Sequence, residues 1–175
     1  MIKKAINLKE TSFTQAINIS AQWCKEWGED LLSEEVLADR VAELIKTKNG
    51  LRGFFAYALS DQNCYLLDKL PFSFVFKLQE AGDDVVEIVI KNLIMSSAQI
   101  IVHESNNNLE YKSNSENISE RCKNILRVLE TKSVTKSVNQ VLKDLDDMGN
   151  SFDNSVKYDS EQKEFIKKQI LDIAH

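Results

Sequence analysis

The chain has 175 residues, of which 43% are hydrophobic and 28% are charged, and its formal net charge is −5. These values are ordinary for one soluble globular domain. Acidic and basic residues are mixed along the chain, so it lacks the basic face typical of proteins that bind nucleic acid. With only five Gly and one Pro, turns are scarce, which favours long helices over an all-β fold.

The N-terminal segment and the cysteines predict a cytoplasmic protein. Residues 1–10 begin with basic residues but lack the apolar run of a signal peptide. No segment offers the roughly 18 uninterrupted apolar residues of a membrane helix, so no membrane association is expected. Cys24, Cys64 and Cys122 are widely spaced and form no Cys-x-x-Cys pair. They are expected to be free thiols in a reducing compartment.

The first third of the chain predicts amphipathic helices. Apolar residues recur at three- and four-residue steps over residues 11–27, which predicts a helix that ends near Gly28. Ser33, followed by two acids, is a good N-cap for a second helix. We expect this helix to stop at Asn49-Gly50, because the flanking periodicity is helical rather than alternating. Residues 54–59 predict a short apolar helix.

Residues 72–90 allow two interpretations. Pro71 suits the first turn of a helix, yet the apolar residues from Phe72 to Leu78 alternate strictly, and Val85–Ile90 is rich in β-branched residues. A hairpin at 72–90, giving an α+β fold, is therefore the alternative. Helices are preferred because the apolar pattern continues unbroken to Val102, which is too long for one strand.

The segment from Asp84 to Ser105 is the most apolar in the chain. A helix that is apolar on nearly every side is buried on more than one face. The sequence therefore predicts an all-α single-domain bundle of six to eight helices around a central helix at 84–105.

The C-terminal part predicts a loop and three helices. Residues 106–117 are almost entirely polar and predict a loop, with Ser115 or Asn117 capping the next helix. Residues 132–175 are expected to be a helical extension that packs on the domain or mediates dimerisation. Their apolar residues step by four, three, four and three, like one side of a coiled coil. This seam consists of Val134, Val138, Val141, Leu145 and Met148. After a loop at 149–159, a last helix should face the core with Phe165, Ile166, Ile170 and Ile173.

No motif predicts catalysis, a metal or a cofactor. Asp144–Gly149 resembles the start of a calcium loop, but its fifth position is Met148 and its twelfth is Ser155, where oxygen ligands such as a bidentate Glu are needed. Nucleophile elbows and phosphate-binding loops have no match. We therefore expect no catalytic residue, no metal site and no cofactor.

A polar stripe on the central helix is the candidate ligand-binding site. Asn92, Ser96, Gln99 and His103 are spaced by four, three and four residues, so they share one side of a helix. Three interpretations remain open: a strip that faces solvent, a buried hydrogen-bonded network, or a small-molecule site.

The same residues carry a resemblance to a protein family. The pattern Asn92-Leu93-x-Met95-Ser96-x-Ala98-x-x-x-x-His103, followed by a polar loop, Ser115 and Arg121, is similar to a small uncharacterised family associated with cyanobacteria. The resemblance covers about residues 30–130 and leaves out the C-terminal 45 residues. It implies an all-helical cytoplasmic protein and assigns no functional residue.

Two functional hypotheses follow. The preferred one is a non-catalytic protein-interaction or regulatory module, whose partner is another protein or a second copy of the chain bound through the seam. The alternative is a small-molecule-binding protein or enzyme with a pocket near the stripe and the aromatic-rich 54–76 region.

Overall fold

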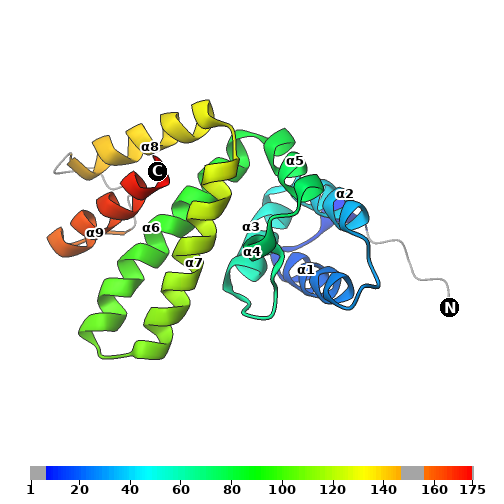
Figure 1. Ribbon diagram of the computed structural model, residues 1–175, viewed down its shortest axis with the longest axis horizontal. Helices are drawn as coiled ribbons and strands as arrows, with labels where there is room; N and C mark the ends of the chain where they lie inside the picture. Colours follow the sequence, from blue (N-terminus) through cyan, green and yellow to red (C-terminus); the bar gives the residue numbers. More distant parts are fainter. Residues whose placement is uncertain (1–6, 147–155, 175) are drawn as a thin grey trace. The chain divides into compact units, whose positions relative to one another are not determined.

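The computed structural model describes residues 7–146 and 156–174. Within them it contains nine α-helices, two short 3₁₀ helices and no strand, so 82% of the described residues are helical (Figure 1). The predicted all-α class is confirmed, and the alternative hairpin at 72–90 is wrong. The chain forms two compact units, Met1–Ala81 and Gly82–His175.

The first unit is built from five α-helices within its described residues. Its elements are η1 (Leu8–Glu10), α1 (Phe13–Gly28), α2 (Glu34–Leu44), α3 (Lys48–Ser60), α4 (Leu66–Lys69) and α5 (Phe72–Ala81). Helix α1 packs chiefly on α3, and α2 packs chiefly on α5. The aromatic core centres on Phe54, whose ring lies 5.1 Å from that of Phe55 and 5.9 Å from that of Phe74.

Side-chain caps explain where the first helices begin. Ser12 and Gln15 form a reciprocal capping box at the start of α1, and Ser33 accepts a hydrogen bond from the Val36 amide of α2. Such caps satisfy amides that have no partner within the helix. The predicted helix at 11–27 and the Ser33 cap are confirmed.

The predicted helix stop at Asn49-Gly50 is wrong. Helix α2 ends at Leu44, and Asn49 and Gly50 lie in the first turn of α3. Thr47 caps this turn by accepting a hydrogen bond from the Gly50 amide at 3.0 Å. A Cβ atom at Gly50 would lie 1.8 Å from the Leu44 carbonyl oxygen. Glycine is therefore present because the two helices approach too closely for a side chain.

The alternating pattern of residues 72–78 is helical. Phe74 and Leu78 are buried one turn apart, whereas Phe72 and Phe76 are exposed one turn apart. Each pair has a four-residue spacing, and the two pairs are offset by two residues. Together they therefore give an apolar residue at every second position, which looks like the alternation of a strand. Periodicity over so short a segment does not separate a strand from a helix with two apolar faces.

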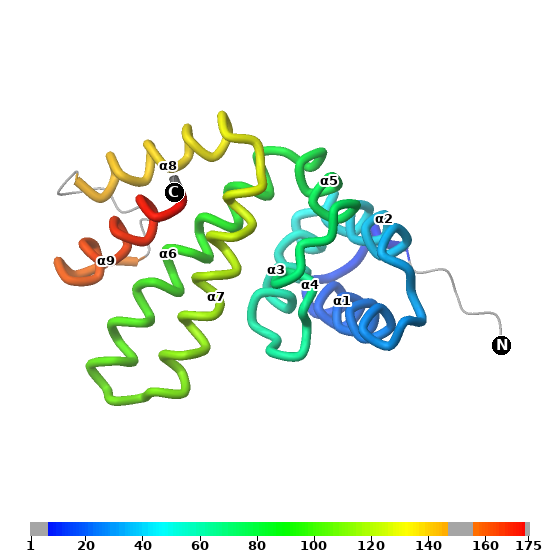
Figure 2. The backbone as a smooth tube through the Cα atoms, viewed as in Figure 1, coloured from blue at the N-terminus to red at the C-terminus, as the bar shows by residue number. Residues whose placement is uncertain are grey.

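The second unit surrounds helix α6. Its elements are α6 (Asp83–Ser105), α7 (Leu109–Val128), α8 (Thr131–Asp146), α9 (Ser160–Leu171) and η2 (Asp172–Ala174). Figure 2 shows α6 and α7 running antiparallel beside each other, and this pair has the most extensive helix contact within the described chain. Helices α8 and α9 also pack on α6. The predicted central helix is thereby confirmed as the core of its unit.

The predicted loop at 106–117 is mostly wrong. Only residues 106–108 connect α6 to α7, and the next nine residues are helical. Ser115 is a buried helical residue rather than a cap, and Asn117 lies in mid-helix. Lys112 stabilises the polar start of α7 with ion pairs to Glu104 at 2.9 Å and to Glu116 at 3.8 Å. Packing and ion pairs overcome the low helix propensity of Asn and Ser here.

The C-terminal helices use their apolar faces inside the second unit. Val134 and Val141 of the seam are buried, Val138 and Leu145 are half-buried, and Met148 lies outside the described residues. In α9, Ile166 and Ile170 are buried. Ile173 in η2 is also buried, whereas Phe165 is half-buried. Most of the predicted loop at 149–159 lies outside the described residues.

Helix α6 is the one described helix that is long and apolar enough to span a membrane. Most of its apolar window is buried by other parts of the protein. Core helices of soluble proteins share these properties, so length and composition alone do not assign α6 to a membrane.

Candidate functional site

The polar stripe of α6 divides into a satisfied part and an exposed part. The Nδ2 atom of Asn92 donates to the Ile88 carbonyl at 2.8 Å, and the Ser96 hydroxyl donates to the Leu93 carbonyl at 3.1 Å. Ser96 is buried and Asn92 is half-buried. These two side chains therefore bond to their own helix, as Ser and Asn commonly do when they lie inside a helix.

The other two stripe residues face more open surroundings. Gln99 is exposed, and His103 is half-buried with its ring 5.6 Å from that of Tyr111 at an interplanar angle of 32°. Within the described residues, no hydrogen bond joins two members of the stripe. The four residues share one side of α6, as predicted, but they form no connected polar network.

Further buried serines occur beside the stripe. Ser97 is fully buried and donates to the Leu93 carbonyl at 2.6 Å. On α7, Ser115 and Ser119 are buried one turn apart, and the Ser119 hydroxyl has no hydrogen-bond partner. These small buried side chains lie on the two helices that have the most extensive contact within the described chain. Their spacing was visible in the sequence, but the polar run around them suggested a loop.

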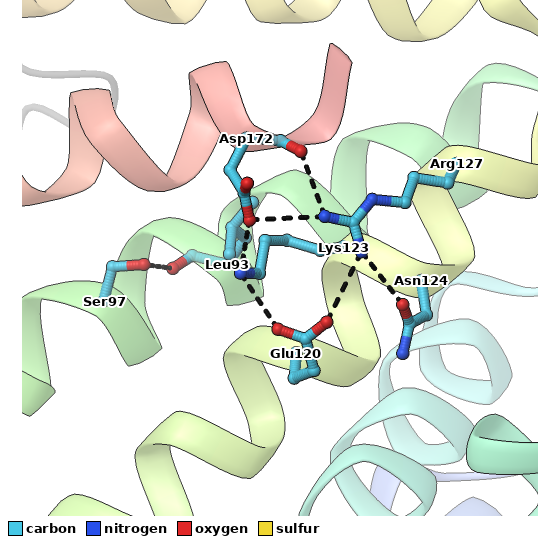
Figure 3. Close-up of polar contacts among 7 residues, drawn as sticks. All are labelled: Leu93, Ser97, Glu120, Lys123, Asn124, Arg127 and Asp172. Atoms are coloured by element: carbon cyan, nitrogen blue, oxygen red, sulfur yellow. Dashed lines mark hydrogen bonds and ion pairs between the residues drawn. The ribbon is translucent and has the colours of Figure 1, made fainter. Parts of the chain in front are cut away.

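An ionic cluster ties η2 to α7, which sequence analysis missed (Figure 3). Lys123 Nζ lies 2.7 Å from Asp172 Oδ2 and 2.9 Å from Glu120 Oε2. Arg127 Nη2 donates to the Asp172 carbonyl oxygen at 3.0 Å and to its Oδ2 at 3.2 Å. The Glu120, Lys123 and Arg127 spacing predicts a shared helix face, but nothing in the sequence pairs that face with Asp172.

The two carboxylates beside Lys123 make its role structural rather than reactive. The Lys123 side chain is only 9% exposed. Burial alone would lower the pKa of Lys123, but hydrogen bonds to Asp172 and Glu120 outweigh it and raise that pKa. Lys123 therefore stays charged, with its donors directed at two carboxylates. In this arrangement it holds the C-terminal turn on α7 instead of acting as a base.

Among the described residues, no group of three or more His, Cys, Asp or Glu side chains lies close enough to hold a metal ion. Helix α8 continues through Asp146, so the first acids of the calcium-like segment are helical. The rest of that segment lies outside the described residues.

The first unit presents an aromatic surface that sequence analysis did not single out. Phe72 is 84% exposed and Phe76 is 49% exposed, one turn apart on the outward side of α5. We call these two residues the α5 phenyl face. Their four-residue spacing places them on one side of α5, but the sequence did not show that this side is exposed.

Contacts on two other sides hold α5 in place. Phe74 and Leu78 are buried in the core of the first unit. The Ser73 hydroxyl donates to Glu34 of α2, and Lys77 Nζ lies 3.3 Å from Asp39 Oδ1 of the same helix. The exposed phenyl rings are thus carried by a helix whose position is fixed.

A comparison with protein families identifies the class of protein. The family model described as "Uncharacterised conserved protein UCP020893" matches residues 12–173. The chain therefore belongs to that family. The match includes residues 131–173, which are most of the C-terminal residues that the sequence resemblance left out. Neither the curated proteins nor the solved structures contain a significant match to the chain.

Proposed function

We propose that this protein is a non-catalytic helical interaction module and that the α5 phenyl face binds a partner protein. The observation that carries the proposal is the exposure of Phe72 and Phe76 on a helix fixed by its core and ionic contacts. Single exposed apolar residues are common on protein surfaces. Two phenyl rings on adjacent turns of an anchored helix present instead a pre-organised apolar contact.

The chemistry of the surface suggests the kind of partner. Aromatic side chains are enriched in the central hot spots of protein interfaces, because they bury a large area with little loss of side-chain entropy. Residues at a four-residue spacing on one helix fit an apolar groove or an amphipathic helix of the partner. The partner is therefore expected to supply an apolar surface that encloses both rings.

Quantitative affinity purification from the source cells tests this proposal. Full-length protein with Phe72→Ser and Phe76→Ser is compared with wild type. A control carries Leu31→Ser and Leu109→Ser, which remove exposed leucines elsewhere. We expect the recovery of a defined partner to fall at least about tenfold with the first variant, which corresponds to a loss of about 1.4 kcal/mol or more of binding free energy. Recovery with the control should match that with wild type. Equal recovery with all three proteins contradicts the proposal.

A small-molecule site near the stripe is the second candidate. The observation that favours it is the half-buried His103 ring, which lies beside the tilted ring of Tyr111 at the exposed end of the stripe. Aromatic and imidazole groups together suit a planar ligand. A fragment screen followed by NMR tests this candidate. Chemical-shift changes that cluster at His103, Gln99 and Tyr111 support it, whereas fragments that bind without changing the chemical shifts of any stripe residue contradict it.

A homodimer through the seam is a further proposal. Val138 and Leu145 are half-buried, so part of the seam remains available to another chain. Light scattering on full-length Val138→Glu, compared with wild type over a range of concentrations, tests it. A dimer that the variant dissociates supports the seam, and a wild-type monomer at high concentration contradicts it.

The cellular location of the protein and the organisms that carry its family are also proposals. The mixed charge and the three free, buried thiols support a cytoplasmic location, with no membrane or nucleic-acid partner. An association of the family with cyanobacteria is proposed from the stripe motif, and the species distribution of family members tests it.

A further inference from the structure

Two of the three free cysteines lie together in the first unit. Cys24 is in α1, and Cys64 follows α3 in the short connection to α4. They are 40 positions apart in the sequence (64 − 24), yet their thiols hydrogen-bond to each other. Both side chains are buried, with 6% and 2% exposure. Cys122 is also buried but belongs to the second unit.

The segment that carries Cys64 is held in a defined conformation. The Asn63 amide donates to Asp61 Oδ1 at 2.8 Å, which forms a tight turn directly after α3. Leu66 and Leu67, just beyond Cys64, are fully buried. Gly53 shows how closely α1 and α3 pack, because a Cβ atom there would lie 2.5 Å from the Ala16 Cβ. The contact between the two sulfurs is therefore part of a tightly packed junction.

We propose that Cys24 and Cys64 form a reversible disulfide when the protein meets a hydroperoxide. The hydrogen bond to Cys64 and burial raise the pKa of Cys24, so the closed junction holds Cys24 as a thiol. A nucleophilic thiolate therefore forms when this junction opens locally to solvent. Gln62 and Asn63, which precede Cys64, are exposed, so local opening of this turn is sufficient to admit a small oxidant.

The reaction balances with hydrogen peroxide as the oxidant. The thiolate of one cysteine of the pair attacks one peroxide oxygen, the O–O bond breaks, and the products are the sulfenic acid of that cysteine and, after proton uptake, water. The sulfur of the other cysteine then attacks the sulfenic sulfur, loses its proton and displaces a second water. Two thiols are oxidised by two electrons, and one peroxide is reduced to two waters. A dithiol reductant reverses the step by thiol–disulfide exchange.

The test uses the full-length, fully reduced protein. After hydrogen peroxide treatment, the remaining thiols are alkylated under denaturing conditions and the protein is mapped by mass spectrometry. We expect an intramolecular Cys24–Cys64 link with the mass loss of two hydrogens, one alkylated cysteine at Cys122, full reversal by dithiothreitol, and a higher melting temperature for the oxidised protein.

Variants assign the roles and supply the control. Cys122→Ser should form the same link, because Cys122 lies in the other unit. Cys24→Ser and Cys64→Ser should both lose the link, and a dimedone probe identifies which remaining cysteine forms the sulfenic acid. The inference is overturned if wild type keeps three alkylatable thiols under conditions that oxidise free glutathione, or if its links join different chains. Circular dichroism shows whether each variant is folded. If a variant does not fold, the wild-type protein alone still tests whether the disulfide forms.

Discussion

The single hydrogen that forms the side chain of Gly50 decides how the first unit is packed. A methyl group there would collide with the backbone oxygen of Leu44, and backbone cannot rotate aside as a flexible side chain can. Gly28 at the end of α1 is different, because a Cβ atom there would meet nothing within 4 Å. The same substitution should therefore have opposite consequences at the two positions.

Gly50→Ala should lower the free energy of unfolding by about 2 kcal/mol or more, because the clash forces α2 and α3 apart. Gly28→Ala should leave stability unchanged or raise it by up to about 1 kcal/mol, because alanine favours helix and restricts the unfolded chain. Urea unfolding of both variants measures the difference. A Gly50→Ala variant as stable as wild type would show that the close approach is absent.

The polar stripe gives a second prediction for single residues. Asn92→Ala and Ser96→Ala remove donors whose acceptors are carbonyls within α6, so no buried group is left without a partner. Gln99→Ala changes an exposed side chain. Each should alter stability by less than about 0.5 kcal/mol. A loss of ~1–3 kcal/mol for any of them would reveal a buried polar partner.

At the scale of elements, the C-terminal turn η2 depends on an ionic contact that joins it to α7. Lys123 is almost completely buried, while its partner Asp172 is about half exposed. Asp146 and Lys167 form a comparable pair between α8 and α9, but both of those side chains are more exposed than Lys123. The two pairs differ mainly in how much solvent screens them.

Asp172→Asn should therefore destabilise the protein by about 1 kcal/mol, because Lys123 and Arg127 both lose a charged acceptor. Asp146→Asn should cost less than about 0.5 kcal/mol. Hydrogen exchange should also show faster opening of η2 in the first variant only. Identical unfolding curves and exchange for the two variants would mean that the cluster does not anchor η2.

How far sequence predicted these elements depended on the length of each pattern. The central helix was predicted to within one residue, because apolar periodicity runs through more than five turns of it. The start of α7 was missed, since Asn and Ser are typical of loops and their burial against other helices is not visible locally. The Asn49-Gly50 stop failed for a similar reason, because the packing that requires Gly50 involves Leu44 of the preceding helix.

The candidate site was predictable only in its placement on α6. The four-residue spacing of the stripe showed that Asn92 and Ser96 share a side, but it did not show that each bonds to its own backbone. The α5 phenyl face and the Cys24–Cys64 contact were not predicted. For the first, the sequence did not show which of the two apolar sides of α5 is buried and which is exposed, and the second depends on a contact between residues distant in sequence.

For the whole molecule, buried titratable groups predict loss of stability in alkali. The pKa of Cys122 is raised by burial, the pKa of Cys24 by its hydrogen bond to Cys64 and by burial, and the pKa of Tyr57 chiefly by burial. Above a pH of about 8.5 the unfolded chain loses thiol protons that the folded protein retains. The stabilisation is therefore complete below this pH and is lost as pH rises.

Urea unfolding under reducing conditions from pH 7 to 10 should show this decline. For each thiol proton that only the folded protein retains, the free energy of unfolding should fall by up to about 1.4 kcal/mol per pH unit above the thiol pKa of the unfolded chain. Cys122→Ala should decline less steeply than wild type, because one such group is gone. An unfolding free energy that stays constant over this range, or an equal slope in the variant, contradicts the burial of these thiols.

Site-specific photocrosslinking in living cells tests the proposed interaction surface most directly. A photoreactive phenylalanine analogue replaces Phe72 or Phe76 in the full-length protein, and Leu31, whose exposure lies between those of the two phenylalanines, serves as the control position. We expect crosslinks to the same partner protein from positions 72 and 76 and none to that partner from position 31. Crosslinks from 72 and 76 only to other parts of the same chain, or the same adducts from all three positions, would contradict it.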